Sequence, residues 1–257
     1  MDSPGAVAGI LIRPKFIGQA CKLYRMDDRN RSVGEMFSAI APRYDLLNRL
    51  LSLGRDRLWR REAVATIRIE RGGRHLDLAT GTADVALEIL RQSGGKAFVV
   101  GSDISLEMMR IGMEKAARAG RKGRIAFVRA PGEALPFSDG VFDSASVAFG
   151  IRNVVDRELG LREMVRVVRP GGRIVVLEFS QPDGTFFGAL YRFYFTRVLP
   201  RIGGLVSKRS AYAYLPESVR SFPSPPEFAE MMRKAGCSSV DYRPLSLGIV
   251  TLYAGTR

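Results

Sequence analysis

Long hydrophobic runs are absent from this chain of 257 residues. A membrane-spanning helix needs about 20 consecutive apolar residues, and no stretch of the sequence approaches that length, so no transmembrane helix is predicted. The hydrophobic fraction is nevertheless 46% and the charged fraction 26%, which is typical of a globular protein with a buried core. The length favours one large α/β domain over two.

Cysteine and histidine are scarce, since the chain has only Cys21, Cys237 and His75. Two cysteines without zinc-site or disulfide spacing favour a reducing, cytoplasmic location. His75 lies in an apolar, strand-like run, where we expect it to pack in a sheet rather than to act in catalysis. Without other histidines, no metal site is predicted and histidine-based catalysis has little support.

Acidic residues are outnumbered, because 40 Lys and Arg face 26 Asp and Glu for a formal net charge of +14. The excess is concentrated in residues 1–75 and 183–257, whereas residues 76–182 are nearly balanced. A basic excess favours anionic partners, namely nucleic acid, an anionic membrane surface or an acidic small molecule. Solubility alone would explain the charge equally well.

Apolar periodicity divides most of the chain into alternating strands and helices. Strands are predicted at residues 75–79, 97–103, 125–129, 142–149, 174–179, 239–245 and 248–256. Helices are predicted from near Val33 to Pro42 and at residues 55–68, 84–92, 105–118, 158–168 and 225–235. Alternation at this spacing predicts an α/β protein with a parallel, doubly wound sheet.

Capping boxes mark two of the helix starts, at residues 32–35 and 224–227. The second has proline at the first helical position, which strengthens the prediction. The helix at residues 55–68 is expected to direct three side chains inward, those of Leu58, Trp59 and Val64.

We predict a flexible extension over residues 1–31 and a single domain over residues 32–257. Within the domain, residues 32–72 form an N-terminal helical cap, and residues 184–215 interrupt the alternation of strands and helices. This insertion is rich in aromatic and basic residues, which together suit the headgroup boundary of a membrane. We expect it to face the substrate or a membrane; a helical cover packed on the sheet is the alternative.

A turn of small residues, 79–84, follows the first predicted strand of the domain. Ligands of open α/β sheets bind beyond the carboxyl ends of the strands, and Asp103 ends the next strand, where a carboxylate accepts both ribose hydroxyls of a nucleoside. The turn lacks the three glycines of a dinucleotide site and carries Asp84, which suits a cationic or zwitterionic nucleoside better than a pyrophosphate. Asp84 as a favourable helix-start residue without any ligand is the alternative.

Further motifs carry a resemblance to a known family. Residues 77–82 resemble motif I of class I methyltransferases, and residues 133–143 and 169–172 look like the stretches before their fourth and fifth strands. Four more segments narrow the choice, at residues 36–48, 149–153, 177–180 and 214–218. Together these motifs resemble the ubiquinone/menaquinone biosynthesis C-methyltransferases over residues 33–257.

The resemblance implies a Rossmann-like class I methyltransferase fold, with a seven-stranded, mostly parallel sheet and helices on both faces. It implies S-adenosylmethionine as the cofactor and C-methylation of a polyprenylated quinol precursor, either demethylmenaquinol or 2-polyprenyl-6-methoxy-1,4-benzoquinol. The residues expected to bind the cofactor are Asp77, Thr82, Asp103, Pro131, Gly132 and Ala148. Asp77 as a buttress of the turn is an alternative reading.

Two residues depart from the family pattern. Pro131 stands where the family often has an acidic or amide side chain to meet the adenine amino group, and proline has no acceptor there and no N–H. Ala83 stands where motif I usually has a second glycine. Both are expected to affect the affinity for the cofactor.

The resemblance also supports three residues for the chemistry on the acceptor. A quinol carbon becomes strongly nucleophilic when its hydroxyl loses a proton, but a phenolic pKa is about 10. We expect Arg152 to stabilise the phenolate, and Asn153 and Tyr44 to orient the hydroxyl or a water that takes the proton. A solvated loop for Arg152 and Asn153, and core packing for Tyr44, are the alternatives, and no general base stands out.

The predicted partners are a polyprenyl quinol and the inner face of a membrane, to which the protein would attach peripherally. A homodimer is a further expectation. No nucleic-acid partner is predicted, because the basic flanks contain no identifiable RNA-binding module. The competing functions are another small-molecule or RNA methyltransferase, and a catalytically weak, membrane-associated scaffold with the same fold.

Overall fold

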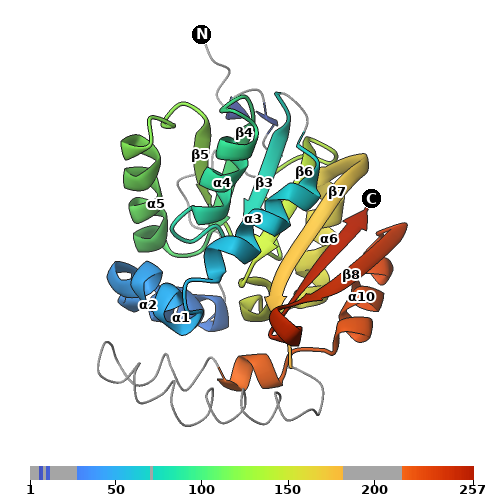
Figure 1. Cartoon of the computed structure of the whole chain (residues 1–257). Coiled ribbons are helices and arrows are strands. Elements are labelled where there is room, and N and C mark those ends of the chain that lie inside the picture. The colour runs from blue at the N-terminus through green and yellow to red at the C-terminus, as the bar shows by residue number, and fades with distance from the viewer. Residues whose placement is uncertain (1–5, 8–9, 12–27, 70–71, 182–215) are drawn as a thin grey trace.

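The computed structural model describes residues 6–7, 10–11, 28–69, 72–181 and 216–257 (Figure 1). A two-stranded antiparallel pair near the N-terminus comprises β1 (Ala6–Val7) and β2 (Ile10–Leu11). The predicted insertion at residues 184–215 and most of the predicted extension lie outside the described residues. Those two predictions therefore stay predictions.

Seven strands form the central sheet, in the order β5-β4-β3-β6-β7-β9-β8. Their bounds are β3 Arg74–Leu78, β4 Phe98–Asp103, β5 Ile125–Arg129, β6 Phe142–Ala148, β7 Val168–Phe179, β8 Ser239–Leu245 and β9 Val250–Thr256. Neighbours from β5 to β7 are parallel, whereas β9 is antiparallel to both β7 and β8. The predicted seven-stranded, mostly parallel sheet is confirmed.

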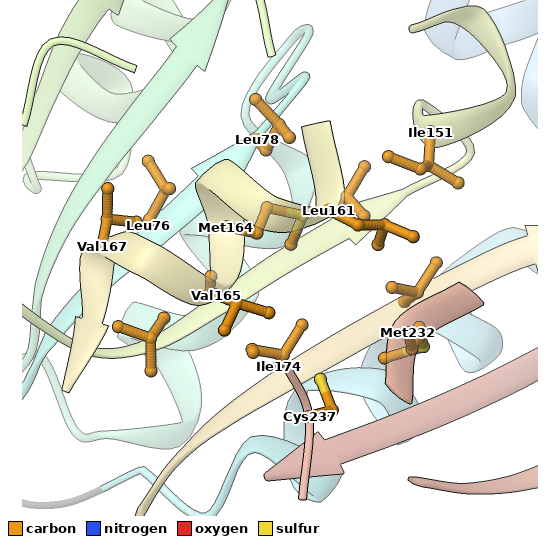
Figure 2. Close-up of a cluster of buried hydrophobic side chains, with 14 of the residues drawn as sticks. Leu76, Leu78, Ile151, Leu161, Met164, Val165, Val167, Ile174, Met232 and Cys237 are labelled. Atoms are coloured by element: carbon orange, nitrogen blue, oxygen red, sulfur yellow. The ribbon is translucent and has the colours of Figure 1, made fainter. Parts of the chain in front are cut away.

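Helices cover both faces of the sheet, as its apolar strands require. One face carries α3 (Asp56–Ile67), α4 (Asp84–Gln92) and α5 (Leu106–Arg118), which contribute to one buried hydrophobic cluster. The other face carries α6 (Arg157–Val167) and α10 (Pro225–Lys234). Figure 2 shows Leu161 and Met164 of α6 near Ile174 of β7 and Met232 of α10 in this second cluster.

A cap of short helices covers the edge of the sheet where the parallel strands end. It consists of α1 (Asp28–Ile40), the 3-10 turn η2 (Ala41–Arg43) and α2 (Tyr44–Leu51). Ser38 of α1 donates to Glu107 at the start of α5 (Oγ to Oε2, 2.6 Å), which ties the cap to the sheet layer. Further short elements are η3 (Ile151–Asn153), a helix at residues 216–220 and η5 (Ser246–Gly248).

Three details differ from the sequence predictions. The chain is already helical at Asp28, the first described residue of this segment, whereas the helix was predicted to begin near Val33. In α3, Trp59 and Val64 are buried but Leu58 is exposed, since it falls one position outside the buried stripe. β7 starts at Val168 and not at residue 174, and its pairing with β6 is irregular at this start.

His75 is buried in β3, as predicted. Its Nδ1 is hydrogen-bonded to Ser144 Oγ on the neighbouring strand β6, and burial lowers the pKa of the imidazole to about 4. The described residues contain no cluster of metal-ligating side chains, nor any helix with the length and apolarity to cross a bilayer. His75 is therefore a packed, neutral residue.

Candidate active site

A cavity opens between the cap and the carboxyl ends of β3, β4 and β6, with about 610 Å³ of space that includes open solvent. Phe37 of α1 and Tyr44 of α2 line its cap side, with ring centroids 6.3 Å apart in an edge-on arrangement. A smaller cavity of about 310 Å³ adjoins it and shares Tyr44, Gly81 and Ala148. The two cavities therefore adjoin at the turn after β3.

Asp103, at the end of β4, lines the larger cavity and holds two loops together. Its Oδ2 accepts from the backbone N–H of Gly81, and its Oδ1 accepts from that of Ser105, each at 2.8 Å. Burial raises the pKa of Asp103, while these backbone donors oppose the shift. The carboxylate lies where the sequence predicted a ribose acceptor, and it also fixes the turn after β3.

Asp77 lies at the base of the smaller cavity and is almost fully buried. Its carboxylate accepts from Thr80 Oγ1 at 2.7 Å and from Ser146 Oγ at 3.0 Å. Burial raises its pKa to about 6, against the effect of these two donors. Asp77 therefore both buttresses the turn and offers a carboxylate whose charge depends on pH.

The backbone at Ala83 is left-handed (φ 65°, ψ 26°), a conformation that favours glycine. The residue is fully buried and lines neither cavity. Its departure from the family pattern therefore adds backbone strain rather than blocking the approach of a ligand.

Thr82 and Asp84 belong to a network that joins the cap to α4 and α5. Thr82 Oγ1 donates to Asp45 (2.6 Å), and Lys115 pairs with both Asp45 (2.9 Å) and Asp84. Arg60 lies 3.7 Å from Asp84, and these two cations lower the pKa of Asp84 despite its burial. Asp84 is thus paired within the protein, and it also lines the smaller cavity, so its predicted contact with a cationic ligand stays a prediction. Sequence reasoning missed Lys115 and Asp45.

Arg152, in η3, is buried and paired rather than exposed to either cavity. Its Nη1 lies 2.6 Å from Oε1 of Glu178, which is completely buried, and 2.8 Å from the carbonyl oxygen of Phe149. The guanidinium also stacks over the Phe179 ring, 5.4 Å from its centroid. The sequence analysis did not name Glu178 as a site residue. Its position inside an apolar strand could have indicated it, because a buried carboxylate needs a partner.

Asn153, next to Arg152, does line the larger cavity. Its Nδ2 donates to the carbonyl oxygen of Phe149 at 3.4 Å, and its buried Oδ1 has no hydrogen-bond partner in the described ranges. Tyr44 lies across the site, with its ring near Gly81. Both residues therefore contact the space between the turn after β3 and the turn after β6.

Glu133 lines the larger cavity, whereas the sequence analysis predicted that Pro131 would be the cofactor contact in this loop. Pro131 is buried but not part of the lining, whereas its neighbour Gly132 is. Glu133 Oε1 accepts from the backbone N–H groups of Val155 (2.9 Å) and Asp156 (3.2 Å), and Oε2 has no partner among the residues that the structure describes. This free acceptor, two positions beyond the proline, escaped the sequence reasoning.

Comparison with known sequences supports one family for this fold and site. A model of the ubiE/COQ5 methyltransferase family matches residues 25–257. The chain belongs to this family. A methyltransferase from Geobacter sulfurreducens, named ubiquinone/menaquinone biosynthesis C-methyltransferase, is 53% identical over 91% of this chain and 92% of its own length. A demethylmenaquinone methyltransferase from Thermus thermophilus is 51% identical over 86% of this chain and its full length.

Solved structures agree on the fold of this methyltransferase. An S-adenosylmethionine-dependent methyltransferase from Thermotoga maritima, described as a possible histamine N-methyltransferase, superposes with a TM-score of 0.62. The match covers 87% of this chain and 99% of that one at 23% identity, which bears on the fold alone.

S-adenosylmethionine is the cofactor of this methyltransferase. The residues present fit it, because the two adjoining cavities are lined by the carboxylate of Asp103 at the end of β4 and by that of Asp77 in β3.

Proposed function

We propose that this methyltransferase methylates a ring carbon of a polyprenylated quinol, either demethylmenaquinol or 2-polyprenyl-6-methoxy-1,4-benzoquinol. The proposal rests on the two adjoining cavities, which bring the carboxylates of Asp77 and Asp103 into one site with Tyr44 and Asn153. It occurs in a chain that is 53% identical to a relative named for quinone biosynthesis. The tail of such a substrate would keep it in a bilayer, so we propose peripheral attachment to the inner face of a membrane.

We assign cofactor contacts along the two cavities. Asp103 accepts the ribose hydroxyls, while Gly132 and Glu133 contact the adenine, with the free Glu133 oxygen replacing the acceptor that Pro131 lacks. Asp77, with Thr82 and Ala148 beside it, lies near the amino-acid portion. The bound cofactor supplies an electrophilic methyl group on a sulfonium.

The acceptor chemistry falls to three residues of this chain. Arg152 lines neither cavity and shares its charge with Glu178, so it would stabilise the phenolate from behind the cavity wall, through its charge and through the Phe149 carbonyl that it holds beside Asn153. A charge fixed in a dry site stabilises a developing negative charge far better than water does. The unpaired Oδ1 of Asn153 and the hydroxyl of Tyr44 would hold the quinol hydroxyl or a water that accepts its proton.

The test is methyl transfer by the purified protein to demethylnaphthoquinols and methoxybenzoquinols with short and long tails, presented in detergent. We expect a mass gain of one methyl group on the ring, with formation of S-adenosylhomocysteine. Transfer RNA is the comparison substrate. Methylation of RNA but not of quinols would favour the RNA reading, and cofactor binding without any transfer would favour a scaffold.

The affinity for S-adenosylmethionine is expected to fall as the pH falls through 6. A cationic ligand favours the charged form of Asp77, whose pKa is about 6 in the free protein, so protonation below that value opposes binding. We expect the Kd to rise roughly tenfold between pH 7 and pH 5. Calorimetry on the parent and on Asp77→Asn measures this. An unchanged pH dependence in Asp77→Asn would assign the titration to Asp103 instead.

A further inference from the structure

Four exposed leucines follow one another closely along the chain, on α2, the following turn and the start of α3. We call them the leucine ridge: Leu46 (55% exposed), Leu50 (45%), Leu53 (83%) and Leu58 (47%). Scattered single apolar residues are normal on a protein surface, but several within one short segment mark a contact surface. Leu46 and Leu50 are four residues apart in one helix and therefore lie on the same side of it.

Leu53 has an unfavourable backbone conformation at the tip of the ridge. Its φ of 52° lies in the left-handed region, which is an outlier for a bulky side chain. Burial does not compensate this strain, because the side chain is the most exposed member of the ridge. The conformation ends α2, because the Gly54 N–H donates to the Arg49 carbonyl oxygen (2.8 Å) and the Leu53 N–H donates to the Leu50 carbonyl oxygen (3.3 Å). Helix capping accounts for the backbone at Leu53 but not for the choice of an exposed leucine, where glycine or asparagine would fit with less strain.

Unpaired arginines border the ridge. A shallow depression beside it is lined by residues of α2, α3, α4 and α5, and its three acidic residues are all engaged, Asp45 and Asp84 with Lys115, and Glu88 with Arg91. In the part of the chain that the structure describes, Arg49, Arg57 and Arg61 form no ion pair, and all three side chains are exposed. The three acidic residues are therefore balanced by cations of the depression, and the remaining arginines give it a net positive charge.

The ridge lies beside the active site. Tyr44, the first residue of α2, lines both cavities, and Leu46 and Leu50 follow it on the same helix. Figure 1 shows α1 and α2 together at the edge of the sheet where β7 ends. A surface that contacts the ridge would therefore be close to the opening of the site.

We propose that the leucine ridge docks on an anionic bilayer, with the leucines entering the acyl boundary and Arg49, Arg57 and Arg61 contacting lipid phosphates. An apolar helix face bordered by free arginines is the pattern of helices that lie in the plane of the interface. This inference rests on the proposed function, because docking would serve to bring the enzyme to a substrate that stays in the membrane. The surface itself is defined by described residues and does not depend on residues 184–215.

Co-sedimentation with vesicles tests the proposal, using phosphatidylcholine with and without phosphatidylglycerol at low and high salt. The full chain is expected to bind the anionic vesicles more tightly, and salt should weaken this binding. Leu50→Glu with Leu53→Glu should lower binding at least about tenfold. Arg57→Ser with Arg61→Ser should lose roughly fivefold per arginine, on anionic vesicles only.

Two further variants keep the test specific. Met113→Glu places the same charge at a site on α5 with similar exposure (48%), and should bind as the parent does. Leu53→Asn should leave the thermal unfolding temperature equal or higher, because asparagine tolerates the left-handed conformation, while vesicle binding falls. Parent-like binding by both leucine variants would overturn the proposal, as would a change of oligomeric state, which would make the ridge a contact between copies.

The activity assay separates this proposal from the proposed function. The leucine variants should methylate a short-tailed, water-soluble quinol at the parent rate and lose activity only on a long-tailed quinol in vesicles. If the parent methylates no quinol but binds vesicles through the ridge, the proposed substrate is wrong and the docking surface stands. If the leucine variants retain full activity on the vesicle substrate, docking through the ridge is wrong.

Discussion

Replacing Arg152 by Met together with Glu178 by Gln is expected to lower the methylation rate about a hundredfold to a thousandfold. Loss of one preorganised donor from an active site has an effect of this size. The affinity for S-adenosylmethionine should change only a few-fold, because neither residue lines the cavities. Single-turnover kinetics and calorimetry measure the two quantities separately.

The double replacement is needed because the two charges are buried together. Arg152→Ala alone would leave Glu178 as an uncompensated buried charge, at about 3–5 kcal/mol of stability. Its loss of rate would then mix unfolding with chemistry. Arg152→Lys is the matched control, since it retains the charge but not the planar group over Phe179. An equal loss of rate and cofactor affinity in the double variant would move Arg152 into cofactor binding and remove its role on the acceptor.

The second large effect is expected from Asp103→Ala, which should weaken the binding of S-adenosylmethionine roughly 10- to 150-fold for each ribose hydrogen bond lost. This range follows from about 1.5–3 kcal/mol for a hydrogen bond to a charged group. S-adenosylhomocysteine has the same ribose and should lose as much affinity. Calorimetry with both ligands measures the effect.

Asp103 also holds backbone N–H groups of two loops, so the structural contribution must be separated. Asp103→Asn retains one acceptor oxygen and removes the charge, and should show an intermediate loss of affinity. Thermal unfolding without ligand reports on the loops. Unchanged affinity in a folded Asp103→Ala protein would show that the ribose assignment is wrong.

Local patterns explain why so much of the fold was predictable. Ser105 caps α5 by accepting from the Met108 N–H (3.2 Å), and Ser224 with Glu227 forms the predicted capping box of α10. These contacts join residues three apart, so spacing in the sequence reveals them. The capping-box pattern at residues 32–35 was misleading because a pattern does not say whether the chain before it is already helical.

The sequence by itself determined the class of the protein and the edge of the sheet at which its cavities lie. Strand and helix periods are local, and a parallel sheet brings the carboxyl ends of its strands to one edge, so the turn after β3 and Asp103 were expected there together. Only the tertiary structure decided which charges remain free. The partners Arg152 and Glu178 are 26 residues apart, and Lys115 and Asp45 are 70 apart. No periodicity relates such positions, so folding alone selects one pairing among many, and with it the cations left to meet a substrate or a membrane.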